Sequence, residues 1–195
     1  DIVQVLAQRP QPAALYGAPA VHPELEALAI AWMQGDCPPA FQIDIAGGAV
    51  DAVERLLACH LVPGDKVAVE NPCFVSSVNT LRVAGLQPAP VGMDGKGMIP
   101  AELEAALAQG AQAVVLSPRA QDPTGCALGA RRAAEIRGVL SRHPNALVIV
   151  DDHFAMLATD RYFNVIPANA RRWALVRSVS KALGPDLRLA VVASD

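Results

Sequence analysis

Short apolar runs alternate with segments of helical periodicity along most of this sequence, and this alternation constrains the fold more than any other feature. Ala113–Leu116 and Leu147–Val150 are continuous apolar runs, typical of strands that are buried on both faces. Val50, Val53 and Leu57 form an apolar stripe at helical spacing. Repeated strand–helix units predict a three-layer α/β fold with a mostly parallel sheet. We predict seven strands, at residues 42–45, 66–70, 87–91, 113–116, 147–150, 173–176 and 188–193.

The remaining segments predict helices and one turn. Helices are expected from residue 23, at 49–60, at 75–84, from 100 and at 131–140. The apolar face of the first helix carries Leu25, Leu28, Ala29 and Trp32. Asp94–Gly97 is predicted to be a turn. Residues 1–23 are rich in proline and alanine, so we predict an irregular N-terminal arm (1–23) followed by one domain (24–195).

The composition argues against several functional classes. The net charge is -3 and no basic run stands out, so nothing indicates that this chain itself binds nucleic acid. The apolar runs end well short of the ~18 residues that span a membrane. The four cysteines are scattered without a CxxC spacing. This pattern predicts reduced thiols in a cytoplasmic protein, and neither a disulfide framework nor a zinc site.

The segment Ser178-Val179-Ser180-Lys181, with Arg188 shortly after it, lies between two apolar runs. A lysine at the end of a buried strand can lose part of its hydration, which lowers its pKa and frees the amine to form an imine. Two serines and an arginine supply donors for a phosphate group. A lysine amine beside a phosphate clamp is what pyridoxal 5′-phosphate (PLP) requires. The alternative is a solvated loop with an exposed lysine.

Two further strand ends carry features that suit a cofactor. Gly47-Gly48-Ala49 joins a strand to a helix, and free amides at the start of a helix can bind phosphate, although Gly-Gly pairs often only form turns. Phe74 follows Asn71-Pro72, and its ring is either core or stacked on a flat cofactor.

Asp151-Asp152-His153 ends another buried strand. A carboxylate there can pair with a protonated ring nitrogen; the alternatives are a helix N-cap or a metal-binding pair. A metal is not favoured, because no further ligand cluster has matching spacing, so we predict no metal site. The Ser117–Gly125 loop, which contains Asp122, is expected to be rigid at the same sheet edge.

In their order and spacing, these motifs resemble the fold-type I, aspartate-aminotransferase-like PLP proteins. The resemblance rests on Gly48-Ala49, Phe74, Asp122-Pro123-Thr124-Gly125, Asp151, Ser178-x-Ser180-Lys181 and Arg188. Pro118-Arg119-Ala120-Gln121 before the Pro-Thr-Gly, with Asp151-Asp152 later, is most similar to the MocR branch of the GntR-type transcription regulators.

The resemblance implies a role for each residue. Lys181 holds PLP as an imine, Phe74 stacks on the pyridine ring and Asp151 pairs with the ring nitrogen. Asp122 and His153 lie beside the ring oxygen. The phosphate is bound at Gly48, by the amides of Ala49 and Val50, and by Ser178, Ser180 and Arg188. The resemblance also implies a homodimer, and a chain that lacks the family's small C-terminal domain and the DNA-binding domain of a regulator.

Three positions depart from the family pattern. Asp122 stands where an asparagine normally donates to the ring oxygen, and His153 stands where a tyrosine is usual. Val21 replaces the glycine expected shortly after Tyr16-Gly17. Asp122 and His153 favour a PLP-binding effector domain that senses PLP, another B6 vitamer or an amino acid. The alternatives are an active PLP-dependent aminotransferase acting on an amino acid and an unliganded relic of the fold.

Overall fold

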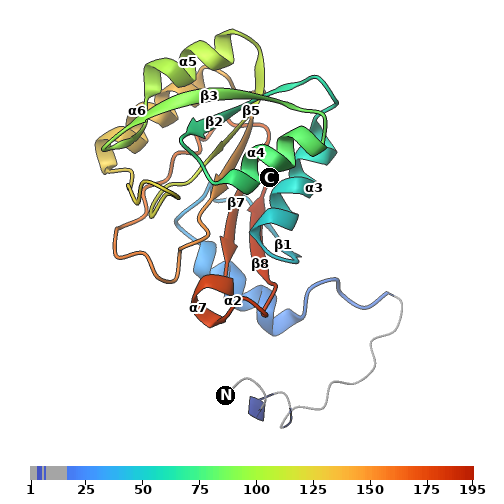
Figure 1. The fold of residues 1–195 in the computed structure, drawn as a ribbon. Coiled ribbons are helices and arrows are strands. Elements are labelled where there is room, and N and C mark those ends of the chain that lie inside the picture. The colour runs from blue at the N-terminus through green and yellow to red at the C-terminus, as the bar shows by residue number, and fades with distance from the viewer. Residues whose placement is uncertain (1–3, 6, 8–16) are drawn as a thin grey trace.

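The apolar runs of the sequence form a central sheet between two layers of helices (Figure 1). The computed structural model describes residues 4–5, 7 and 17–195. The strands are β1 (Gln42–Ala46), β2 (Lys66–Asn71), β3 (Gln87–Asp94), β4 (Gly97–Met98), β5 (Ala111–Leu116), β6 (Leu147–Asp151), β7 (Trp173–Ser178) and β8 (Ala190–Ser194). The helices are α2 (Pro23–Met33), α3 (Ala49–His60), α4 (Val75–Val83), α5 (Pro100–Ala108), α6 (Ala130–Ser141) and α7 (Ser180–Leu183). This is the predicted three-layer α/β fold.

The strand order is β1-β8-β7-β6-β5-β2-β3-β4. Neighbours from β7 to β3 are parallel, whereas β8 runs antiparallel to both β1 and β7. The seven predicted strands are all present. The two-residue β4, which pairs with β3, is an eighth strand where the sequence predicts only a turn. Two residues are too few to show an alternating pattern. The last strand begins at Ala190 rather than at Arg188, which belongs to the loop before it.

Each face of the sheet is covered by its own set of helices. On one face, Met33, Leu103 and Ile136 of α2, α5 and α6 pack in one buried cluster. On the other face, Leu57 of α3 and Leu81 of α4 pack in a second cluster. The strands contribute alternate side chains to the two clusters, which explains why their sequences are almost continuously apolar.

The buried face of α2 differs from the prediction. Leu28 is 66% exposed, and the buried residues of the helix are Ala29 and Met33. Ile30 is exposed as well. Because α2 is apolar on several faces, the spacing of its apolar residues does not determine which face meets the sheet.

Most of the predicted N-terminal arm, including Tyr16, lies outside the described residues. The part from Gly17 to Val21 consists of turns and bends. None of the helices described in residues 4–5, 7 and 17–195 is both long and apolar enough to span a membrane.

The strand directions bring five motif-bearing loops to one edge. Since β1 and β7 both run antiparallel to β8, β1 points the same way as the parallel strands. The carboxyl ends of β1, β2, β5, β6 and β7 therefore share an edge, where α/β sheets bind ligands. The residues that follow these strands include Gly48, Phe74, Asp122, His153 and Lys181.

Candidate cofactor site

The register of the sheet brings the first and the last motif together. Ala46 at the end of β1 and Ser178 at the end of β7 both pair with Ala190, from opposite sides. Gly48 and Ser180 each follow two residues further along. The turn after β1 therefore lies close to the turn after β7.

Gly48 and Arg188 form one end of the site. Gly48 has a φ of 108°, a conformation that favours glycine, and it precedes α3 without a side-chain cap. A Cβ atom on Gly48 would lie 2.4 Å from Nη2 of Arg188, so a larger residue here would displace this guanidinium. A guanidinium and free amides at the start of a helix together suit an anion, and the binding of a phosphate by the amides of Ala49 and Val50 stays a prediction; we refer to this place as the anion site.

The two predicted serines adjoin this anion site. The Ser180 hydroxyl donates to the Leu187 carbonyl at 2.7 Å and accepts from Nη1 of Arg188 at 3.5 Å. Ser178 is buried, and its hydroxyl accepts from the backbone N–H of Ser180 at 3.3 Å. These contacts tie the loop before β8 to the turn that carries Lys181.

Lys181 lies in α7, a four-residue helix that is not among the predicted helices. Its side chain is exposed, so the predicted loss of hydration is not found in this chain. Nζ lies 5.2 Å from the ring centroid of Phe154, a residue to which the sequence analysis assigns no role. The cation–π contact holds the amine on the side of the cavity formed by β6 and β7.

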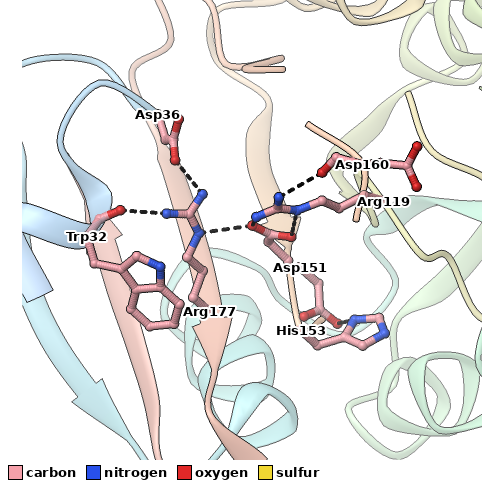
Figure 2. A network of polar contacts seen from close by, with 8 residues as sticks. Trp32, Asp36, Arg119, Asp151, His153, Asp160 and Arg177 are labelled. Atoms are coloured by element: carbon pink, nitrogen blue, oxygen red, sulfur yellow. Dashed lines mark hydrogen bonds and ion pairs between the residues drawn. The ribbon is translucent and has the colours of Figure 1, made fainter. Parts of the chain in front are cut away.

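Asp151 and His153 lie at the end of β6, which is separated from β1 and its anion site by β8 and β7. Asp151 Oδ2 forms an ion pair with His153 Nδ1 at 3.3 Å (Figure 2). Burial lowers the pKa of His153, but contact with Asp151 and its negative charge outweigh burial, so the pKa lies above its usual value. The other oxygen of Asp151, Oδ1, is buried and has no hydrogen-bond partner among the described residues. It can accept a hydrogen bond from a ligand.

One cavity of about 190 Å³ joins these groups. Phe74 is 44% exposed and lines it, so its ring is not the ordinary core residue of the alternative reading. Asp122 lines the same cavity. The lining residues are Ala49, Val50, Val53, Phe74, Ser76, Ser77, Thr80, Val115, Asp122, Asp151, His153, Ser178, Ser180, Lys181 and Arg188. The predicted site residues thus meet in one place, with Gly48 against Arg188 at its border.

Five lining residues were not predicted from sequence: Val53, Ser76, Ser77, Thr80 and Val115. Three of them are hydroxyl residues on α4, beyond Phe74. Their only sequence signal is a run of small polar residues in a helix whose polar and apolar residues are not clearly separated onto two faces. Such a run does not indicate a site.

A buried polar network fixes the backbone beneath the site. Asp152 is fully buried and accepts from Nε of Arg177 at 2.9 Å and from Nε of Arg119 at 2.8 Å. Nη2 of Arg177 also donates to Asp36 at 2.6 Å (Figure 2). Asp152 is the neighbour of Asp151 in the chain, so this network positions the end of β6. The sequence shows Asp152 and Arg119 but not their contact.

The site suits an elongated ligand that is anionic at one end and has a hydrogen-bond donor at the other. Arg188 and the start of α3 suit a phosphate, and the unpartnered Asp151 Oδ1 suits a protonated ring nitrogen. Phe74 offers a flat apolar surface between these ends, and Lys181 offers an amine. PLP has each of these complementary groups. Within the described residues, no three metal-ligating side chains gather in a cluster.

Known proteins with similar sequences include regulators. The chain is 54% identical over 195 residues to the vitamin B6 salvage pathway transcriptional repressor PtsJ of Salmonella typhimurium, covering 100% of the chain and 45% of that protein. It is 33% identical over 159 residues to the HTH-type transcriptional regulator YdcR of Escherichia coli, covering 78% of the chain and 34% of that protein. The chain therefore spans less than half the length of these curated relatives.

Solved structures with the same fold include aminotransferases. The kynurenine aminotransferase of Pyrococcus horikoshii matches 100% of the chain and 50% of its own length, with a TM-score of 0.83 and 21% identity. The aminotransferase Aro8 of Candida albicans matches 92% of the chain and 44% of its own length, with a TM-score of 0.81 and 22% identity. At these identities the likeness establishes the fold alone.

The model of the family "Aminotransferase class I and II" matches residues 2–195. Proteins of this fold family generally use pyridoxal phosphate. The chain belongs to the class I and II aminotransferase family, with the fold-type I architecture and with transcription regulators among its relatives.

Proposed function

We propose that this chain is the PLP-binding effector domain of a MocR-type transcription regulator. The observation that carries the proposal is the single cavity in which Lys181, Asp151 and the Gly48–Arg188 anion site meet. The 54% identity to the repressor PtsJ, over the whole chain, supports a regulator over an enzyme. The signal would be PLP itself, another B6 vitamer or an amino acid.

Each residue has a distinct part in holding the cofactor. Arg188, Ser178, Ser180 and the first amides of α3 would bind the phosphate. Phe74 would cover one face of the ring, and Asp151 Oδ1 would accept a hydrogen bond from the protonated ring nitrogen. Lys181 would present its amine to the cofactor aldehyde. When bound, PLP supplies an electron sink for amine chemistry.

The polar groups near the ring oxygen favour sensing over turnover. Asp122 cannot donate a hydrogen bond to the ring oxygen unless it is protonated. The loss of this donor affects turnover more than sensing, because a sensor needs affinity for the cofactor more than a tuned electron sink. His153 can donate from its ring, and its raised pKa extends its charged form toward neutral pH. The alternative is an active aminotransferase acting on an amino acid; the likeness to solved aminotransferases establishes the fold alone and does not favour this activity.

The remaining features of the proposal concern the intact protein. DNA binding would belong to residues outside this chain, since the chain covers 45% of PtsJ. We also propose a homodimer in the cytoplasm; the four cysteines are free, which agrees with a reducing compartment.

The decisive experiment is a visible absorption spectrum of the full-length protein with PLP, before and after a panel of amino donors. A band that persists through the panel supports a sensor. A band that converts to the pyridoxamine form, and returns with an oxo acid, establishes the aminotransferase instead.

Borohydride reduction locates the attachment residue. The chain contains three lysines, Lys66, Lys96 and Lys181, so peptide mapping can distinguish them. Lys181→Ala should abolish covalent PLP and leave the fold intact, because the side chain is exposed. Lys96→Ala, in the turn before β4, is the matched control and should keep the label. PLP fixed to the Lys181→Ala variant of this chain would refute the assignment.

A further inference from the structure

Glu70 is an acidic residue in a buried position of β2. It is 4% exposed and follows the apolar residues of the strand. Its Oε2 accepts from the Gln121 amide at 3.2 Å, while its Oε1 is buried without a hydrogen-bond partner among the described residues. A fully buried carboxyl with one unpartnered oxygen is costly, so it requires a physical explanation.

Glu70, whose Oε1 lacks a partner, lines a small cavity. The cavity has a volume of about 20 Å³ and is lined by Glu70, Asp151 and His153, with Phe74 and Ser117 beside them. Glu70 Oε1 and Asp151 Oδ1 lack hydrogen-bond partners in the described part of the chain, while His153 Nδ1 is paired with Asp151 Oδ2 at 3.3 Å. Roughly 10–15 Å³ suffices for one water molecule, which makes about two to four hydrogen bonds in a protein interior. Volume and partner number therefore both match a single water.

We propose that this cavity binds one water that links a protonated Glu70 to the Asp151–His153 pair. Glu70 is thereby a positioning residue, which acts on the ring-pairing carboxylate without touching the ligand itself. The inference rests on the proposed function only in its last step, where Asp151 meets PLP. Asp151 lines both the small cavity and the cofactor cavity, so it connects the two.

Burial favours the protonated form of Glu70. The pKa of Glu70 is raised to about 8, chiefly by burial and to a smaller extent by the negative charge of Asp151. Contacts with Gln121 and the Ser117 backbone, and a charged His153, act in the opposite direction. At neutral pH the Glu70 carboxyl is thus a donor. Through the water it gives Asp151 a hydrogen bond, which favours the ionised form of Asp151 that a protonated pyridine nitrogen needs.

The first test needs no PLP. Carboxyl carbon-13 NMR of the full-length protein should show one glutamate that titrates near pH 8. Glu70→Gln should remove that titration, and Glu26→Gln, on the exposed surface of α2, should retain it. If the high-pH titration is absent from the wild-type protein or persists in Glu70→Gln, the proton assignment is wrong, whatever the protein does with PLP.

The second test addresses the water and its effect on Asp151. A crystal structure should show an ordered water within hydrogen-bonding distance of Glu70 and Asp151, and a dry cavity would overturn the proposal. With PLP bound, Glu70→Leu should move the pH midpoint of the visible band by about half a unit or more, while Glu70→Gln, which keeps a donor, should move it less. Equal midpoints in all three proteins would show that Glu70 does not act on Asp151. A wild-type protein that binds no PLP fails the proposed function and leaves the NMR result standing.

Discussion

The guanidinium of Arg188 lies where a side chain on Gly48 would begin: a Cβ atom on Gly48 would lie 2.4 Å from Nη2 and 2.9 Å from Cζ of the guanidinium. The φ of Gly48 is 108°, which costs a non-glycine residue roughly 1–3 kcal/mol. Because Gly48 has no side chain, the charge of Arg188, which is 140 positions later in the sequence, can lie at the start of α3.

Gly48→Ala should weaken PLP binding by about 10-fold to 100-fold, because the displaced Arg188 loses a charge-assisted contact with the phosphate. Equilibrium dialysis or a spectral titration measures this directly. Gly47→Ala is the control: its Cβ would meet only Asp51, at 3.4 Å, so affinity should be retained. Equal losses in both variants would show that the turn, and not the guanidinium, determines affinity.

Asp122→Asn should shift the pH midpoint of the visible band of bound PLP. An asparagine amide restores a neutral donor beside the ring oxygen, whereas the aspartate places a negative charge in the cavity. A spectral pH titration of both proteins measures the shift. Asp186→Asn, on the exposed loop before β8, should leave the midpoint unchanged. An Asp122→Asn titration that superimposes on the wild-type curve places Asp122 away from the ring.

The His153–Asp151 pair should make stability depend on pH. The pKa of His153 is raised in the folded protein, so the pair stabilises the fold fully below the unfolded pKa of about 6.5 and loses this effect as the pH rises through the folded pKa. His153→Gln should therefore cost more at pH 5.5 than at pH 8.5, with a difference of roughly 1 kcal/mol or less. Urea unfolding at both pH values checks this. A cost that grows with pH would contradict the sign.

Arg177→Leu should destabilise the protein by about 3–5 kcal/mol, because it removes one partner of the fully buried Asp152. Urea unfolding measures the loss, and Asp152→Asn in a double-mutant cycle isolates the pair. Arg131→Leu is the control, since its ion pair with Glu135 is exposed and should be worth less than about 1 kcal/mol. Equal costs for Arg177→Leu and Arg131→Leu would mean that Arg119 alone satisfies Asp152.

Residues with strong local patterns were predictable. The strands at Ala113–Leu116 and Leu147–Val150 are continuous apolar runs, and such runs are stable only between two helical layers. The motif residues lie directly after strands, so the direction of the parallel strands places them at one edge. Local rules fail where the apolar pattern is ambiguous. In α2, Leu28 is exposed although its spacing places it on the predicted apolar face.

By itself, the sequence determined the layers, the seven main strands and the motif residues that line the cavity after the strand ends, because strand periodicity and strand ends are local properties; the five other lining residues had no such signal. The tertiary structure alone decided which distant groups touch: Gly48 with Arg188, Asp152 with Arg119 and Arg177, and Glu70 with the cavity behind Asp151. Asp152 and Arg177 are 25 positions apart in the sequence, and Gly48 and Arg188 are 140 positions apart. Burial and charge at such positions depend on packing across the sheet, which no local pattern records.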